Sequence, residues 1–237
     1  GPKTIKIWGG YENGRGASDY YITDTADISA IRFGNQYTIT PIASVNGSLG
    51  RIFPTLNNGT LVPNFKSLFV NAAHLNSISA NLFDGVSGVP VPSMFDATFA
   101  GCTSLQSIPA GLFDGISGVA EYMFYRTFGG CTSLQSIPNG LFSGVSATGN
   151  ATGSANIMFS NTFANCTALS ALPNTLFGTI NAPGVTKDLM FFGMFSGDTA
   201  LGGYVQKTLF ANIVDSNSSN NEYQIPSQSK SYNKSYV

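Results

Sequence analysis

The chain has 237 residues, of which 43% are hydrophobic and 10% are charged, with a formal net charge of −1. Charged residues normally make up about 25% of a soluble domain, so this surface depends on Ser, Thr, Asn and Gly, as in secreted and cell-surface proteins. The apolar content excludes global disorder, and the absence of a basic patch excludes nucleic acid as a partner.

Residues 1–62 carry no repeat and predict a small β-rich N-terminal cap or subdomain. The segment opens with Gly1-Pro2, which resembles a protease-cleavage scar, so the absence of a leader sequence is not informative. Short β-prone runs alternate with Gly, Asn and Asp clusters. These runs are residues 4–8, 20–23, 30–33, 37–42 and 51–53.

Residues 63–204 contain internal repeats, which are the main signal in this sequence. Three stretches align from Met94, Met123 and Met158, with cysteines at 102, 131 and 166, in steps of 131 − 102 = 29 and 166 − 131 = 35 residues. Weaker copies begin at Ser67 and at Met190, where Asp198 takes the cysteine position. We therefore expect about five stacked units with atypical terminal copies.

Each unit is predicted to contain a short helix, a short strand and a turn. Phe95, Phe99 and Cys102 are spaced i, i+4 and i+7, which is one face of a helix. The strand is predicted at residues 105–108, where Pro109 ends it, and Asp114-Gly115 forms the turn. Length varies before each Met-Phe pair, at 117–122 and 146–157, which indicates loops on one edge. The fold class is therefore an α/β repeat solenoid of strand–turn–helix units.

Residues 205–237 are predicted to be a C-terminal cap and polar tail, because the chain becomes rich in Ser, Asn and Tyr after Asp215. The tail can lie along the repeats or add a strand at an edge. Self-association through this tail is a further expectation.

The units resemble the BspA-like, or Treponema-type, class of leucine-rich repeat, whose pattern is A/T-Phe-x-x-Cys-x-x-Leu-x-x-Ile. The match is carried by TFAGCTSLQSIPAGLF and its equivalents, over about residues 65–202. The sequence departs from the class in the Pro that directly follows the Ile. The resemblance implies a curved solenoid with a sheet on its concave face. It also implies a bacterial surface or secreted adhesin.

Candidate binding residues fall into two groups. The first is a row of neutral hydrogen-bonding side chains at equivalent strand positions: Asn76, Gln106, Ser107, Gln135, Ser136 and Ser170. Such a row suits a glycan or an uncharged protein surface, or serves solubility alone. The second is a group of aromatic residues near a Gly-rich loop, at Trp8, Tyr11, Tyr20 and Tyr21, which either contact a ligand or pack in the cap.

The sequence predicts neither catalysis nor a metal or cofactor site. The three cysteines share one repeat position, which indicates a column of buried thiols, and no Cys-x-x-Cys or Cys/His cluster accompanies them. His74 is the sole histidine and occupies a variable repeat position. Asp84 and Asp114 both precede Gly, which is typical of turns rather than of a glycosidase pair.

These observations predict a non-enzymatic, extracellular or cell-surface binding module of a bacterial adhesin or receptor, whose partner is an extracellular protein or glycan. The alternative is a structural spacer or a filament or surface-layer subunit with no small-molecule ligand. An enzyme acting on polysaccharide is the third hypothesis. No run of about 18 apolar residues exists, so no membrane insertion is expected within this segment.

Overall fold

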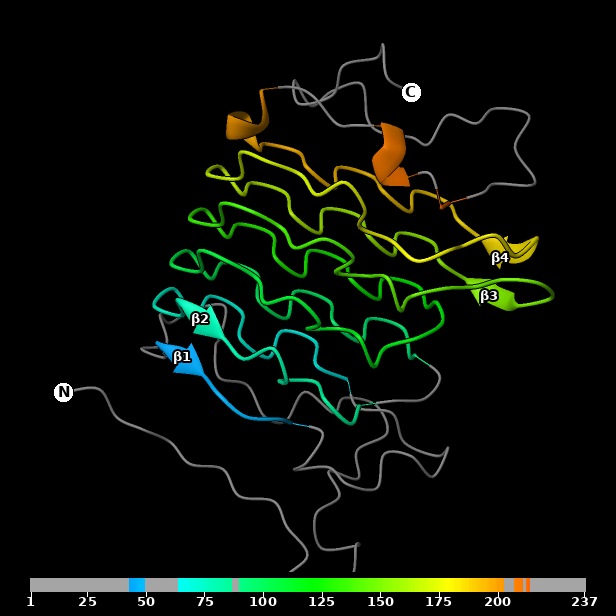
Figure 1. The fold of residues 1–237 in the computed structure, drawn as a ribbon, viewed down its shortest axis with the longest axis horizontal. Coiled ribbons are helices and arrows are strands. Elements are labelled where there is room, and N and C mark those ends of the chain that lie inside the picture. Colours follow the sequence, from blue (N-terminus) through cyan, green and yellow to red (C-terminus); the bar gives the residue numbers. More distant parts are fainter. Residues whose placement is uncertain (1–42, 50–63, 87–89, 203–206, 211, 214–237) are drawn as a thin grey trace, which may run out of the picture.

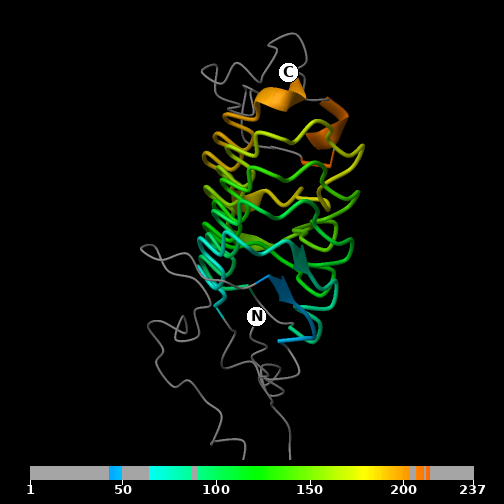
Figure 2. The ribbon, with the colours of Figure 1, turned by 90° about the vertical axis from the view of Figure 1, so that its left-hand side faces the viewer.

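The computed structural model describes residues 43–49, 64–86, 90–202, 207–210 and 212–213. The chain winds through a series of coils that stack one upon another along a single axis (Figure 1). Turned by 90°, the same coils lie in register from one end of the stack to the other (Figure 2). The predicted repeat solenoid is therefore present.

Three columns of phenylalanine rings form the core, each with one ring from every coil. Along each column the centroids of neighbouring rings lie 5.3–6.0 Å apart, and their planes differ by 23° or less. The first column is Phe65, 95, 124, 159 and 191, the second is Phe69, 99, 128, 163 and 195, and the third is Phe83, 113, 142, 177 and 210. Five coils therefore share one continuous apolar core.

Rings of the first and third columns also meet edge to face. Phe113 and Phe124 have centroids 5.0 Å apart at 71°, and Phe159 and Phe177 have centroids 4.8 Å apart at 63°. Such pairs contribute about 0.5–1.5 kcal/mol each beyond the area they bury. Leucines at 75, 105, 134 and 169 are fully buried beside them at one repeat position. A single coil cannot bury these side chains, so the coils depend on one another.

The predicted helices are wrong, because the described residues contain no α-helix. Successive tight turns occupy residues 93–101, 122–130, 157–165 and 189–197, which we call the turn segments. Asp96 N–H donates to Ser93 O three residues back (3.0 Å), whereas Phe95 N–H donates to Met123 O in the next coil (2.8 Å). Amides thus alternate between a local turn and the neighbouring coil.

The backbone of the turn segments explains why the apolar spacing was misleading. Every fourth residue has positive φ, as at Ser93 (60°), Ala97 (53°) and Gly101 (73°), which an α-helix forbids. A four-residue repeat of turns nevertheless places Phe95 and Phe99 on the same inner face. The i, i+4, i+7 spacing is therefore satisfied without a helix, and the α/β class is corrected to a solenoid of turns and short bridges.

The regular elements are short. β1 (Ser44–Val45) pairs in parallel with β2 (Ser77–Ile78), and β3 (Thr152–Ser154) pairs in parallel with β4 (Gly184–Thr186). Two 3₁₀ helices, η2 (Thr199–Leu201) and η3 (Lys207–Phe210), lie at the C-terminal end. The strand expected at residues 105–108 is reduced to parallel bridges that join Ser107 to Ser136 and Ser136 to Ala171.

The stack extends past both predicted boundaries of the solenoid. On the N-terminal side, residues 43–49 add part of another coil, since Leu49 N–H donates to Leu82 O (2.7 Å). On the C-terminal side, Phe210 stacks on Phe177 and Ile213 bridges to Ile180, beyond residue 204. The rest of the expected N-terminal cap and the polar tail lie outside the described residues.

Candidate functional site

The predicted row of neutral side chains lies on the surface of the stack. Asn76, Gln106, Gln135 and Ser170 are all exposed, and so are the adjacent serines at 77, 107 and 136. We call these seven residues the polar column. The structure brings together the residues that the repeat alignment predicted as neighbours.

Backbone hydrogen bonds between coils hold the polar column in register. Gln135 N–H donates to Gln106 O (3.1 Å), and Ser170 N–H donates to Gln135 O (3.3 Å). Since the backbone of each residue is fixed to the next coil, the side chains repeat at the spacing of the stack. The arrangement presents amide and hydroxyl groups without a charge, which can donate to and accept from a neutral ligand.

A row of threonines borders the polar column, and the sequence analysis missed it. Thr103, Thr132 and Thr167 are exposed, and each directly follows a buried cysteine. The Oγ1 atoms of Thr103 and Thr167 donate to Ala73 O and Thr132 O, both at 3.4 Å. The repeated Cys-Thr dipeptide was the available signal. The hydroxyls of Thr103 and Thr167 already bond between coils, so they support the column more than they offer donors to a ligand.

The second predicted group, Trp8, Tyr11, Tyr20 and Tyr21, lies outside the described residues. The structure instead exposes large apolar side chains on the turn segments, where the sequence indicated none. Tyr122, Leu189 and Phe192 are 36%, 43% and 45% exposed. Phe192 directly follows Phe191, which is buried, so the two consecutive phenylalanines point in opposite directions. Composition alone could not separate the inward ring from the outward one.

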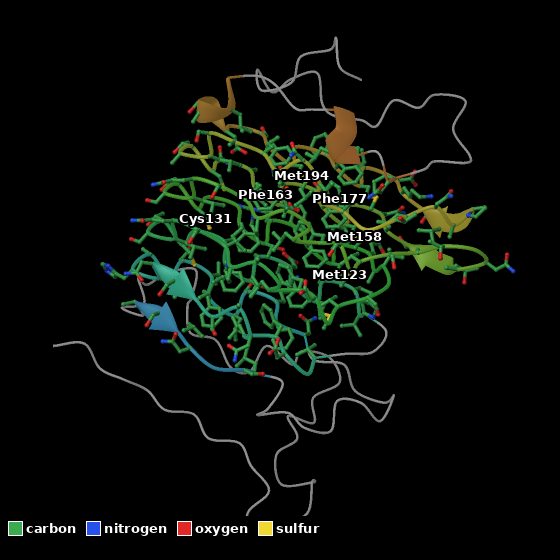
Figure 3. All side chains as sticks on the ribbon, viewed as in Figure 1. Met123, Cys131, Met158, Phe163, Phe177 and Met194 are labelled. Atoms are coloured by element: carbon green, nitrogen blue, oxygen red, sulfur yellow. The ribbon has the colours of Figure 1, made fainter. Side chains whose placement is uncertain are left out.

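The three cysteines form the predicted buried column. Cys102, Cys131 and Cys166 donate from Sγ to the carbonyl oxygens of Phe69, Phe99 and Phe128 in the preceding coil, each at 3.3 Å. Buried threonines repeat the same contact: the Oγ1 atoms of Thr98, Thr127 and Thr162 donate to Phe carbonyls one coil back, each at 2.9 Å. Figure 3 shows Cys131 and Phe163 within the stack.

Burial sets the chemistry of these thiols. It raises the pKa of Cys102 to about 12 and raises the pKa of Cys131 well above its usual value. Burial also raises the pKa of Cys166, and the neighbouring Asp198 carboxyl adds to the effect. A thiol that stays protonated is a poor nucleophile. The cysteines therefore act as hydrogen-bond donors between coils and not as reactive groups.

Asp198 ends the cysteine column in the fifth coil, as the repeat alignment predicted. Its Oδ1 accepts a hydrogen bond from Cys166 N–H (2.7 Å), while its Oδ2 is buried without a hydrogen-bond partner among the described residues. Burial raises the pKa of Asp198 to about 8. The carboxyl is therefore largely protonated at neutral pH.

The other polar residues considered in the sequence analysis, His74, Asp84 and Asp114, occupy surface turns. His74 is exposed, and so are Asp84 and Asp114, whose N–H groups each close a turn with the residue three positions earlier. Asp96 is buried and its carboxylate pairs with Lys66 Nζ (2.8 Å). Within the described residues, no three His, Cys, Asp or Glu side chains gather in a way that could hold a metal ion.

Comparisons with known proteins add little. No protein-family model matches the chain, and no curated protein matches it. A solved leucine-rich repeat protein from Bacteroides ovatus is similar at 15% identity and a TM-score of 0.18, over 57% of this chain and 50% of that one. The chain thus spans half the length of that structure, and a similarity this weak carries no argument. No helix in the described ranges is long and apolar enough to cross a lipid bilayer.

Proposed function

We propose that the chain is an extracellular binding module of a bacterial surface adhesin or receptor, and that the polar column contacts a host protein or glycan. The observation that supports this proposal is the uncharged, exposed row at Asn76, Gln106, Gln135 and Ser170. Neutral amides and hydroxyls at a fixed spacing suit a ligand with many neutral hydrogen-bonding groups. The resemblance to BspA-like surface repeats favours the same function.

The surface charge supports the proposal as well. Between Ser67 and Thr186, Arg126 is the sole Lys or Arg, and Asp84, Asp96, Asp114 and Glu121 are the sole acids. A nearly uncharged stretch neither attracts anionic surfaces nor steers charged substrates. Recognition must then depend on hydrogen bonds and shape, and it should be little affected by salt.

The test is to screen the full chain on glycan arrays and on extracellular-matrix proteins, and then to compare variants on each ligand found. Gln106→Ala combined with Gln135→Ala should weaken binding about tenfold, because two lost hydrogen bonds at about 0.5–1.5 kcal/mol each amount to that factor. Thr148→Ala combined with Asn150→Ala, in an exposed loop, is the matched control. Equal binding by both double variants would exclude the polar column as the contact surface.

A structural spacer is the second candidate, and the three phenylalanine columns favour it. They form an apolar core that continues through five coils, which resists bending and suits a rigid spacer. A chain that binds no ligand in the screen and polymerises at high concentration would favour this role over recognition.

A further inference from the structure

Two asparagine–glycine pairs in the described part of the stack have different surroundings. Asn46-Gly47 directly follows β1 at the N-terminal end of the stack (Figure 1), and Asn139-Gly140 lies in the third coil. Two further pairs, at 13–14 and 58–59, lie outside the described residues. Asparagine is a chemically labile residue, and a glycine after it has no side chain to hinder attack by its own nitrogen. Whether a pair reacts then depends on whether the fold leaves both groups free to meet.

Both reacting groups of the first pair are free. Asn46 and Gly47 are exposed. Among the residues that the structure describes, neither the Asn46 side-chain amide nor the Gly47 N–H makes a hydrogen bond. Gly47 has a φ of 102°, and a methyl group built on it would meet no atom within 4 Å. The Gly47 nitrogen can therefore turn toward the Asn46 side chain without breaking a hydrogen bond or meeting a neighbour.

The fold holds the same two groups in the second pair. Asn139 Oδ1 accepts a hydrogen bond from Asn174 N–H (3.1 Å), and Gly140 N–H donates to Thr175 O (2.9 Å). Both partners belong to the fourth coil, so the neighbouring coil fixes the side-chain amide and the attacking nitrogen at once. Attack there requires a local opening that breaks both hydrogen bonds, which lowers the reactive fraction about tenfold.

We propose that Asn46 is a site of spontaneous deamidation in the folded protein, and that the stack protects Asn139 from the same reaction. The Gly47 nitrogen attacks Cγ of Asn46, a bond forms between them, and the Cγ–Nδ2 bond breaks. Ammonia leaves with the proton that the Gly47 nitrogen carried. Water then opens the cyclic imide. Opening at Cγ gives aspartate, and opening at the main-chain carbonyl carbon gives isoaspartate, in which the main chain runs through the former side chain.

Isoaspartate at position 46 disturbs contacts that join this segment to the first coil. Val45 O accepts a hydrogen bond from Ser79 N–H (2.9 Å) on one side of position 46, and Leu49 N–H donates to Leu82 O (2.7 Å) on the other. Isoaspartate adds one carbon atom to the main chain between these two hydrogen bonds, so they cannot both keep their geometry. Deamidation therefore loosens residues 46–49 and places a negative charge at one end of a nearly uncharged stack.

Peptide mapping by mass spectrometry of the full chain, kept folded in mildly alkaline buffer, tests the proposal. Aspartate and isoaspartate should accumulate at position 46 about tenfold faster than at position 139, because two hydrogen bonds protect the second pair. In urea the two positions should react at similar rates, because those hydrogen bonds are lost. Asn46→Gln is the control variant: it should abolish the product at position 46 and leave the slow reaction at position 139 unchanged.

Hydrogen exchange of fresh and aged protein measures the structural consequence. The amides of Ser79 and Leu49 should exchange faster in the aged unmodified chain, but not in Asn46→Gln aged in the same way. Equal rates at positions 46 and 139 in the folded chain, or no product at position 46, would overturn the proposed site. Unchanged exchange of both amides in a chain that carries isoaspartate at position 46 would overturn its effect on the first coil.

Discussion

Asn165 and Gly197 fit each other across neighbouring coils. Both have positive φ, at 62° and 82°, and Asn and Gly are the residues that adopt this conformation most readily. A methyl group at Gly197 would overlap Oδ1 of Asn165. The same relation joins Asn161 with Gly193. The absence of a side chain in one coil therefore makes room for an amide of the coil before it.

We predict that Gly197→Ala lowers the free energy of unfolding by about 2 kcal/mol, from positive-φ strain and from the overlap with Asn165. Gly130→Ala is the matched control: φ is 77° there, but the nearest atom to the new methyl group is 3.7 Å away. It should cost about 1 kcal/mol, from strain alone. Urea denaturation measures both values.

Adding Asn165→Gly to the Gly197→Ala variant should remove the overlap and leave the strain. In the Asn165→Gly background, Gly197→Ala should then lower the free energy of unfolding by only about as much as Gly130→Ala lowers it in the unmodified chain. Additive losses in the double variant would show that the two residues do not touch.

At the scale of the element, substituting glycine for alanine should have different effects in a turn segment and in an α-helix. Ala97 has a φ of 53°, where glycine is favoured, whereas Ala100 in the same segment does not have positive φ. Ala97→Gly should raise the free energy of unfolding by about 0.5–1 kcal/mol, since glycine relieves the strain. Ala100→Gly should lower it by a similar amount, since glycine costs more conformational entropy.

Chemical denaturation of the two variants measures the difference. In an α-helix both substitutions would destabilise the chain by about 1 kcal/mol. If Ala97→Gly destabilised the chain as much as Ala100→Gly, the result would contradict the positive φ of Ala97 and favour the helix that the sequence predicted.

The register of the coils could be predicted from the sequence, but the local backbone could not. Phe99, Cys102 and Leu105 recur at fixed spacing, and burial of equivalent side chains in each coil makes them stack. The same spacing suits a helix and a run of four-residue turns equally well. Gly or Asn at positive φ is the signal that separates them, as at Gly101 and Asn165, but Ala97 breaks that pattern.

The polar column and the exposed apolar side chains of the turn segments also differ in how far the sequence predicted them. The polar column follows from the alignment, because Gln106 and Gln135 occupy one repeat position and are both exposed. The exposure of Leu189 and Phe192 does not follow from the alignment, because Leu and Phe are residue types that usually lie in the core. Side chains alternate in direction along the turn segment, so Phe192 faces outward while Phe191 lies in the core.

At the scale of the whole molecule, a single buried charge has its largest effect on stability at the end of the stack. Each coil is held by its neighbours, so a solenoid opens from its ends. The column of buried thiols occupies the second, third and fourth coils, and Asp198 takes its place in the fifth. Asp198 is 1% exposed, and its Oδ2 has no hydrogen-bond partner in the part of the chain that the structure describes. Ionisation there places an unpaired charge against the fourth coil.

We predict that the fifth coil loosens as pH rises. Burial raises the pKa of Asp198 in the folded chain from 3.8 to about 8, so the folded state binds this proton more tightly than the unfolded state. The corresponding stability is fully present below about pH 4 and is lost progressively as pH rises to about 8, at up to about 1.4 kcal/mol per pH unit. Asp198→Asn and Asp198→Cys lack this titration, and the second restores the residue of the other coils.

The difference in unfolding free energy between Asp198→Asn and the unmodified chain, measured from pH 4 to pH 9, isolates Asp198 because all other groups titrate in both proteins. Asp198→Cys gives the same comparison below about pH 8, since its added thiol titrates near about 8.5 in the unfolded chain. That difference should increase with pH in favour of the variants and level off above about pH 8. Hydrogen exchange should then show faster opening in residues 189–201 than in the third coil. A difference that does not change with pH would mean that the Asp198 carboxyl reaches solvent, and that the fifth coil does not close over the column of thiols.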